Sequence, residues 1–480
     1  MLTRPAFLRS FASLVIGSLV GTLAPGRAAW AQQVPARATR FEVTVDPATR
    51  AAPLTGRLLV VVSKTGQPEP RMQIAPQGPA LFGIDLDQLR AGQSAVVDEK
   101  SLAYPLALAS LPPGEYYVQA IVNVYEQIKR ADGKTIWVHF PHEGTQEVMQ
   151  IAAGNVYSEP QRVRVGDGGT IRLRINKVIA PSPRPSDTEW VKRVRIQSQK
   201  LTAFWGRPVY VHATVLLPKG YSERTNVRYP TVFTFGHNVP FGFQPDSTRV
   251  RNIGQINAVT GVETGFDFYK SWVSDGFPRF IAVSFEQATP FFLDSYSVNS
   301  VSNGPYGDAM VEEIIPALER QFRMIGKPYA RLAEGASTGG WQTLALQLKH
   351  PDFFGGAWVL QPDPIDFRRY QLVDIYTDTN AFVMPNTQFT TTERPFRRTV
   401  EGQVAWSLRQ LSLFEEVLGT RDGRTTSSRG GRRSTDHSTR MGIRNRCGTR
   451  SRERSIATSR TTCATTATTF ASTPSATGPR

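Results

Sequence analysis

Apolar and polar residues alternate over much of the first third of the chain, as they do in strands with one buried face. The segment from Phe41 to Val45 alternates in this way, and Leu58 to Val62 is a continuous apolar run of strand length. A Pro-Pro-Gly turn signal at residues 112–114 precedes another strand-like segment at residues 116–125. These segments predict a β-rich domain over residues 40–181, built as an antiparallel sandwich.

The pattern changes after a proline-rich stretch at residues 181–185, which we interpret as a linker. From residue 189 onward, strand-like apolar segments alternate with helical ones. One helical apolar face runs from Met310 to Phe322, with Asp308 as its expected N-cap. The expected strands cover residues 209–218, 229–235, 280–285, 329–335 and 354–360, with a further helix at 341–349. This alternation predicts an α/β domain with a mostly parallel sheet over residues 189–420.

The last part of the chain, residues 421–480, has a different composition. Of its residues, 36 are Arg, Ser or Thr, and none is Lys, Trp or Tyr. Such a segment cannot bury a core, so we expect a disordered tail. One hypothesis is a frameshift, because a GC-rich gene that is read in the wrong frame gives this composition; the other is a genuine basic tail. Translating the DNA after codon 418 in the other two frames would separate the two hypotheses.

The formal charge of +16 is concentrated at the ends of the chain. Residues 421–480 contain 13 arginines and 3 acidic residues, and Arg4, Arg9 and Arg27 lie near the N-terminus. Residues 32–420 are therefore nearly neutral, which gives no reason to expect nucleic-acid binding by the folded body. The two cysteines, Cys447 and Cys463, both lie in the tail, and no Cys/His metal constellation is present. We expect no metal or other cofactor.

The N-terminus has the pattern of a secretory signal peptide. A basic start is followed by an apolar stretch at residues 11–24 and by the small-x-small sequence Ala29-Trp30-Ala31. The apolar stretch is short for a bilayer span, so we favour a cleaved signal over residues 1–31 rather than an uncleaved anchor helix. The mature protein is then expected in the periplasm or outside the cell, with no membrane attachment.

The strongest chemical signal is the sequence Gly-Ala-Ser-Thr-Gly from Gly335 to Gly339. A serine hydroxyl needs a base that takes its proton and donors that hold the oxyanion. Gly-x-Ser-x-Gly supplies the sharp turn between strand and helix that exposes such a serine. The expected strand before it and helix after it fit this turn, so we assign Ser337 as the nucleophile. The alternative is a structural glycine-rich turn.

Two backbone N–H groups are needed to bind the oxyanion of the tetrahedral intermediate. The first is expected from Thr338, and the second from the loop after the strand at 229–235, which contains His237 and Asn238. His237 could also be considered as the base. In hydrolases of this order the base follows the serine, so we favour a loop-shaping role for His237.

The region from about Val209 to Gln371 resembles the esterase family of α/β-hydrolases that includes esterase D-like, feruloyl esterase-like and enterochelin esterase-like enzymes. Four segments carry the resemblance, namely Phe-Thr-Phe-Gly-His-Asn from residue 233, Asn-Gly-Pro-Tyr-Gly-Asp-Ala-Met-Val-Glu-Glu from 303, Gly-Ala-Ser-Thr-Gly-Gly-Trp from 335 and Pro-Asp-Phe-Phe-Gly-Gly-Ala-Trp from 351. The resemblance implies a Ser-His-Asp triad, hydrolysis of a small-molecule carboxylic ester through an acyl-enzyme, and no cofactor.

The chain departs from that family where the triad aspartate and histidine are expected, beyond two further strands after residue 360. Here much of that territory is the tail. His350 ends the helix after the serine, and the pair Asp436-His437 lies in the tail, so we favour neither as the base. Asp363 or Asp366 could orient a histidine, but turn chemistry beside proline is the favoured interpretation. We therefore expect an esterase by descent that is a poor enzyme.

Two other functions fit parts of the sequence. A non-catalytic ligand- or carbohydrate-binding protein could keep the fold and line a pocket with aromatic side chains, although such residues are more often core. The candidates are Trp205, Phe241, Phe243, Phe291, Phe292 and Tyr296. Nucleic-acid binding through the arginine-rich tail is the third possibility, and the lack of interleaved aromatic residues argues against base stacking there.

Overall fold

The computed structural model describes residues 39–237, 242–249, 264–370, 372–385 and 391–419. The expected signal segment (residues 1–31), Asn238, Phe241 and the arginine-rich tail (residues 421–480) lie outside the described residues. None of the described helices is long and apolar enough to cross a membrane.

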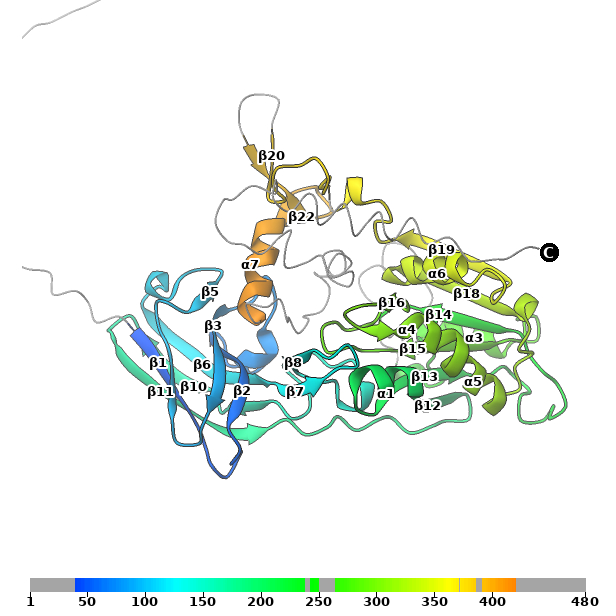
Figure 1. The fold of residues 1–480 in the computed structure, drawn as a ribbon, viewed down its shortest axis with the longest axis horizontal. Coiled ribbons are helices and arrows are strands. Elements are labelled where there is room, and N and C mark those ends of the chain that lie inside the picture. Colours follow the sequence, from blue (N-terminus) through cyan, green and yellow to red (C-terminus); the bar gives the residue numbers. More distant parts are fainter. Residues whose placement is uncertain (1–38, 238–241, 250–263, 371, 386–390, 420–480) are drawn as a thin grey trace, which may run out of the picture. The chain divides into compact units, whose positions relative to one another are not determined.

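The N-terminal strands form one nine-stranded sheet with the order β4-β1-β11-β9-β6-β2-β3-β5, and β10 pairs with β6 (Figure 1). Its strands are β1 (Thr39–Val45), β2 (Leu54–Ser63), β3 (Ala80–Leu89), β4 (Ser94–Val97), β5 (Leu102–Tyr104), β6 (Gly114–Val124), β9 (Val156–Ser158), β10 (Gln161–Val165) and β11 (Gly169–Val178). A β-rich domain is therefore observed. The described strands form a single sheet, in which β1 and β11 are parallel, so a sandwich of two sheets is not confirmed.

This sheet buries apolar side chains on both faces. Along β2, every residue except Thr55 is buried, because alternate side chains enter two different clusters. Val60 belongs to the cluster that also holds Phe41 and Phe82, whose rings stack at 6.3 Å. Leu59 and Val61 point to the other face, into a cluster with Phe414. A two-sided strand of this kind appears in sequence as the continuous apolar run that we observed.

The second sheet has six strands in the order β12-β13-β15-β14-β18-β19 (Figure 1, green to yellow). They are β12 (Val191–Ser198), β13 (Val209–Leu216), β14 (Thr231–Phe235), β15 (Ile281–Glu286), β18 (Arg331–Ser337) and β19 (Gly356–Pro362). The first two pairings are antiparallel, and β15, β14, β18 and β19 run parallel. The expected α/β domain with a mostly parallel sheet is thus observed, and β19 is its last described strand.

Helices flank this sheet, as its βαβ connections require. They are α1 (Gln199–Trp205), α3 (Gly265–Val273), α4 (Tyr306–Asp308), a π-helical segment (Ala309–Ile314), α5 (Ile315–Gln321) and α6 (Thr338–Lys349). The helix from Tyr306 begins earlier than expected: Asp308 has helical angles and makes no side-chain cap, and its N–H donates to the Asn299 side chain. Pro316 in the first turn of α5 has no N–H, which accounts for the wider π turn before it.

The remaining described strands pair in separate two-stranded units. They are β7 (Glu126–Lys129) with β8 (Thr135–Val138), β16 (Asn299–Ser300) with β17 (Gly304–Pro305), β20 (Val383–Pro385) with β21 (Thr391–Glu393), and β22 (Pro395–Arg398) with β23 (Val404–Ser407). Between the two large sheets, the proline-rich segment at 181–185 forms neither helix nor strand, as a linker does.

The last described helix, α7 (Leu408–Leu418), packs on the N-terminal sheet. Its buried Phe414 contacts the Tyr104 ring with centroids 5.4 Å apart. The Arg57 side chain, from β2, donates through Nε to the Val417 carbonyl at 2.8 Å. A cation at the C-terminal end of a helix meets the negative end of the helix dipole. The four residues that precede α7, Val404–Ser407, form β23.

Candidate active site

Ser337 lies at the junction of β18 and α6, in a conformation that few non-glycine residues adopt. Its φ and ψ are 56° and −122°, and the helix begins with the next residue. A positive φ at a non-glycine residue costs about 1–3 kcal/mol, and such strain concentrates at functional sites. The turn predicted from Gly-x-Ser-x-Gly is therefore present as a strained strand-to-helix turn, which is the geometry of a nucleophile elbow.

The glycines of the motif allow the backbone to fold this closely. A Cβ atom on Gly339 would lie 2.0 Å from the Phe235 carbonyl oxygen at the end of β14. A Cβ on Gly335 would lie 2.3 Å from the Gly339 carbonyl carbon. Any larger residue at either position would push α6 away from the sheet. The loop that follows Phe235 is thereby held against the first turn of α6, where the second oxyanion donor is expected.

The Asp363 carboxylate accepts hydrogen bonds from the hydroxyl groups around Ser337. Ser337 Oγ donates to Asp363 Oδ1 at 3.1 Å, and Thr338 Oγ1 donates to Asp363 Oδ2 at 2.7 Å. The Tyr296 hydroxyl donates to the same Oδ2 at 2.7 Å. In addition, the Asp363 backbone N–H donates to the Ser337 carbonyl at 3.1 Å. Asp363, which follows β19, is thus hydrogen-bonded to the turn that carries Ser337 through both its carboxylate and its backbone.

His237 lies on the other side of Thr338. Its Nε2 is 3.0 Å from Thr338 Oγ1, and its Nδ1 contacts the Asp294 carboxylate. The His237 side chain is 11% exposed, and that of Asp294 is fully buried. A buried carboxylate on one ring nitrogen fixes the orientation of the imidazole and directs the other nitrogen at Thr338.

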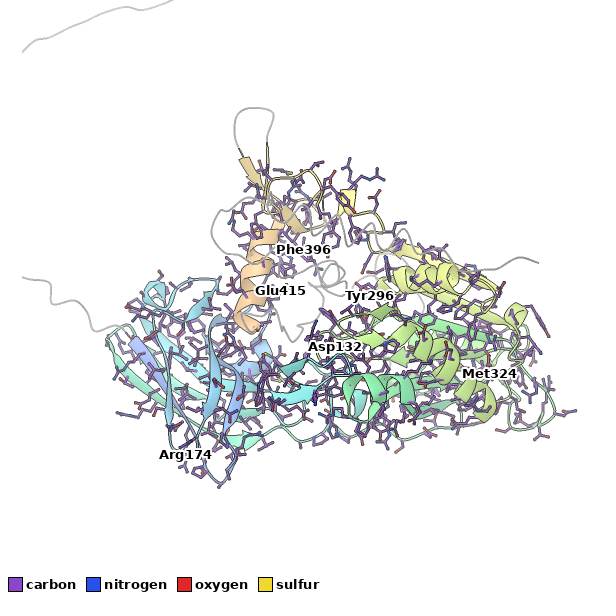
Figure 2. The ribbon with its side chains drawn as sticks, viewed as in Figure 1. Asp132, Arg174, Tyr296, Met324, Phe396 and Glu415 are labelled. Carbon is purple, nitrogen blue, oxygen red and sulfur yellow. The ribbon has the colours of Figure 1, made fainter. Side chains whose placement is uncertain are left out.

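The loop between β15 and β16 supplies Asp294 and Tyr296, the latter labelled in Figure 2. Tyr296 and Ser297 both have positive φ, at 58° and 54°. Two buried hydrogen bonds brace this loop: the Tyr296 N–H donates to Asp294 Oδ1 at 2.9 Å, and Gln342 from α6 reaches the same oxygen at 3.3 Å. The strained loop therefore places one carboxylate against His237 and one phenol against Asp363.

The structure changes the interpretation of two predicted residues, Asp363 and His237, and keeps that of Asp366. Asp363 was assigned to turn chemistry, and it contacts Ser337 instead; Asp366 does have the expected turn role, because it accepts from the Arg368 N–H at 2.9 Å. His237 sits in the expected loop, and its side chain makes specific polar contacts beyond shaping it. Asn238 and the Asp436-His437 pair lie outside the described residues.

Asp294 and Tyr296 were not predicted as site residues. Asp294 follows an aromatic segment with no periodic pattern, and Tyr296 was considered only as a possible pocket residue. Asp363 carried a usable signal: β18 and β19 are parallel neighbours, so the residues that follow their carboxyl ends meet at one edge of the sheet. The register confirms this, since Ser337 pairs with Pro362.

The described part of the chain does not bring a histidine into hydrogen-bond contact with Ser337. His350 caps α6 at its far end, where its N–H donates to the Leu346 carbonyl, and burial lowers the pKa of its imidazole. Nor do the described residues contain a cluster of three or more His, Cys, Asp or Glu side chains that could hold a metal ion. In this geometry the Ser337 hydroxyl donates its hydrogen bond to the Asp363 carboxylate.

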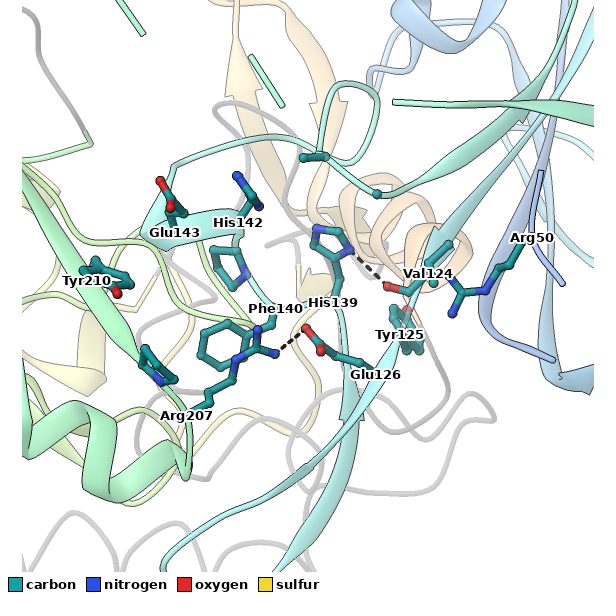
Figure 3. Close-up of a pocket in the computed structure, with 14 residues that line it drawn as sticks. Arg50, Val124, Tyr125, Glu126, His139, Phe140, His142, Glu143, Arg207 and Tyr210 are labelled. Atoms are coloured by element: carbon teal, nitrogen blue, oxygen red, sulfur yellow. Dashed lines mark hydrogen bonds and ion pairs between the residues drawn. The ribbon is translucent and has the colours of Figure 1, made fainter. Parts of the chain in front are cut away.

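A separate cavity of about 440 Å³ is lined by residues from β6, β7, β13 and the loops beside them (Figure 3). Arg207 forms an ion pair with Glu126 and lies over the Phe140 ring at 4.4 Å. His139 donates through Nδ1 to the Val124 carbonyl at 3.0 Å, and burial lowers the pKa of its imidazole. No Ser, Thr or Cys is among the described residues that line it, so its hydroxyl groups are the phenols of Tyr125 and Tyr210.

No protein-family model and no curated protein sequence matches the chain. Among solved structures it is similar to an IroE-like serine hydrolase from Shewanella oneidensis, at 16% identity over 36% of this chain and 51% of that one, with a TM-score of 0.24. It is also similar to the fluorophosphonate-binding serine hydrolase FphF from Staphylococcus aureus (14% identity, 38% and 62% covered, TM-score 0.25). A third is a ferulic acid esterase from Anaeromyces mucronatus (17% identity, 38% and 63% covered, TM-score 0.22).

The chain thus spans about half to two thirds of the length of these structures. The proteins that it resembles are serine hydrolases and esterases, but the similarity is too low to define a function. The function of this chain therefore has to be inferred from the geometry around Ser337.

Proposed function

We propose that this chain is an exported serine hydrolase that cleaves carboxylic esters through an acyl-enzyme on Ser337. The observation that carries the proposal is the strained conformation of Ser337, with φ at 56°, where β18 passes directly into α6. Strain of this kind persists only where the surrounding structure enforces it, and here it presents a hydroxyl at the end of a sheet.

The first turn of α6 supports the same chemistry. The Thr338 N–H is the first amide of the helix, where unpaired N–H groups and the helix dipole favour a developing negative charge. Gly339 holds the end of β14 against this turn, so the loop containing His237 can supply a second donor. Two such donors contribute about 3–4 kcal/mol each to binding the oxyanion in serine hydrolases.

Turnover of p-nitrophenyl acetate by the full chain tests this proposal. We expect slow release of p-nitrophenol, because no described histidine contacts Ser337, and we expect Ser337→Ala to abolish it. Ser412→Ala is the matched control, since Ser412 lies on α7 and not in the serine turn. Turnover that survives Ser337→Ala would refute the assignment, and fast turnover lost in that variant would refute only the expectation of slowness.

A second candidate is a ligand-binding protein, which the 440 Å³ cavity favours. Its lining combines the aromatic faces of Tyr125, Phe140 and Tyr210 with the guanidinium groups of Arg50 and Arg207, a mixture suited to a polar ligand such as a sugar. Thermal-shift measurements with neutral and acidic oligosaccharides would test it. Stabilisation that is lost in Arg207→Ala and kept in Ser337→Ala would favour binding at this cavity.

A further inference from the structure

The cavity of about 440 Å³ contains one arginine without a counter-charge (Figure 3). Arg207 forms an ion pair with Glu126 at 2.5 Å. Arg50, from the turn between β1 and β2, forms no ion pair within the part of the chain that the structure describes, and its Nε is buried without a hydrogen-bond partner. Its guanidinium points toward Val124 and Tyr125 in Figure 3. Such a guanidinium is a binding point for an anion, because its N–H groups pair best with a carboxylate or a phosphate.

The two acidic side chains at the same cavity already have cationic partners. Glu126 pairs with Arg207, and Glu143 pairs with Arg195, whose hydrogen bond lowers the pKa of the Glu143 carboxyl. Both carboxylates keep oxygen lone pairs that can accept further hydrogen bonds. A second negative charge on a ligand would lie beside them and be repelled, so the cavity suits a ligand with one negative charge, held at Arg50.

His139 adds another hydrogen-bond acceptor to the cavity wall. Its Nδ1 lies 3.0 Å from the Val124 carbonyl, which can only accept, so Nδ1 carries the hydrogen. Burial lowers the pKa of the imidazole, so the ring is neutral at pH 7 and Nε2 keeps a lone pair. A ligand with hydroxyl groups can donate to this nitrogen and to the carboxylates of the two glutamates.

We propose that this cavity binds an acidic sugar of the uronic acid class, with its carboxylate on Arg50 and its hydroxyl groups donating to His139, Glu126 and Glu143. A neutral sugar would leave Arg50 unpaired, and an anion without hydroxyl groups would leave the three acceptors without donors. The inference goes beyond ester hydrolysis at Ser337, and it assigns a ligand of defined charge to the cavity.

The apolar walls of the cavity suit a sugar ring. Phe140 and Tyr210 both line it, and each is held by a neighbour. The Phe140 ring packs edge-on against Trp205 with centroids 5.5 Å apart, and Arg195 lies over the Tyr210 ring at 4.6 Å. Walls that are fixed before binding reduce the entropy lost on binding. The volume lies within the range of roughly 300–1,000 Å³ that is typical of small-molecule sites.

Saturation-transfer NMR titrations of the full chain with methyl β-D-glucuronide and methyl β-D-glucoside test this proposal. The two probes share the pyranose ring, and a carboxylate in the first takes the place of a hydroxymethyl group in the second. We expect the wild type to bind the glucuronide at least about 10-fold more tightly than the glucoside. Arg50→Gln should remove this preference, and Arg50→Lys should retain part of it, because the positive charge remains.

Arg164→Gln is the matched control, because it removes an exposed arginine of β10 that pairs with Asp167, and it should bind both probes as the wild type does. The melting temperature of each variant separates loss of binding from loss of the fold. Equal affinity of the wild type for the two probes, no binding of the glucuronide, or an unchanged preference in Arg50→Gln would overturn the proposal.

Acetate serves as a third probe, because it carries the carboxylate without the ring or the hydroxyl groups. Acetate that binds as tightly as the glucuronide would show an adventitious anion site and overturn the assignment of a sugar. Turnover of p-nitrophenyl acetate by the same preparations reports on Ser337 separately, so the hydrolase and the sugar site can each fail without the other.

Discussion

The two large sheets of this protein differ in how they are covered. One face of the N-terminal sheet is covered by α7, whose Phe414 is fully buried and whose Val417 and Glu416 carbonyls accept from Arg57. The six-stranded sheet instead ends at β19, where Trp358 and Leu360 are each 53% exposed. The last described helix therefore stabilises the first sheet, and the sheet that holds Ser337 keeps an apolar edge.

This difference bears directly on the chemistry. From the sequence, the triad aspartate and histidine were expected beyond two further strands after β19. In the described residues of this chain, the segments after β19 form two-stranded units and the helix α7. None of these joins the six-stranded sheet. The groups near Ser337 come instead from the loops after β14, β15 and β19.

Removal of the Phe414 side chain should have the largest effect on stability, because this ring packs α7 onto the N-terminal sheet. The ring is fully buried among Leu59, Val61 and Tyr104, so Phe414→Ala should lower the free energy of unfolding by about 3–5 kcal/mol. Chemical denaturation followed by circular dichroism measures the change. Leu413→Ala is the control, because Leu413 on the same helix is 43% exposed. Equal losses in both variants would show that α7 does not stabilise the sheet through its buried face.

Arg57 tests the polar part of the same contact. The side chain is 1% exposed, burial lowers its pKa, and it donates to the Val417 carbonyl and to Asp85. Arg57→Ala should cost about 2–3 kcal/mol, because it strands buried acceptors at the end of α7. The control is Arg174→Ala, which removes an ion pair with Asp46 whose arginine is 67% exposed and should cost less than about 1 kcal/mol (Figure 2). A similar cost for both variants would contradict this account.

The buried His212 of β13 makes stability depend on pH. Burial lowers the pKa of its imidazole, and its Nε2–H donates to the Glu143 carbonyl at 2.6 Å. As the pH falls through 6.5, the unfolded chain binds a proton at this residue before the folded chain does, so the free energy of unfolding should decrease. Denaturation at pH 7.5 and 5.5 should show a smaller decrease in His212→Gln. An equal decrease in both proteins would remove His212 as the cause.

The smallest effect on stability is expected at the open edge. Trp358→Lys and Leu360→Thr replace half-exposed side chains, so each should change the free energy of unfolding by no more than about 0.5 kcal/mol. Both should reduce concentration-dependent association, because an apolar edge strand can pair with another chain. Light scattering and denaturation measure the two properties. A loss above about 2 kcal/mol would show that another segment covers β19.

Local signals in the sequence predicted the serine turn, the strand-rich N-terminal part and the mostly parallel second sheet, whereas the predicted N-terminal sandwich is not confirmed. Gly335 and Gly339 mark a backbone approach that depends only on neighbouring residues, and the change from alternating strands to strand–helix units marks the second domain. The packing of α7 could not be predicted, because its apolar face does not specify which sheet it covers. The prediction that Asp308 is the N-cap of its helix was wrong. The helix begins earlier, and the Asp308 N–H donates to the side chain of Asn299, nine residues earlier.

The site was predictable only where chemistry lies within one short motif. Ser337 and Thr338 belong to the motif, and His237 follows a strand at a recognisable place. Asp294 and Tyr296 come from a loop whose positive φ values and buried hydrogen bonds are set by tertiary contacts. Asp363 reaches Ser337 through the pairing of β18 with β19, which depends on the strand order in the sheet.

The central claim is that Ser337 is a nucleophile, and mapping of a covalent adduct tests it most directly. The full chain is treated with a fluorophosphonate, digested and sequenced by mass spectrometry, with Ser337→Ala treated in parallel. We predict a single phosphonyl adduct on Ser337 in the wild type, formed slowly, and none in Ser337→Ala. An adduct on any other residue, or an unmodified Ser337 after prolonged treatment of the folded protein, would contradict the claim.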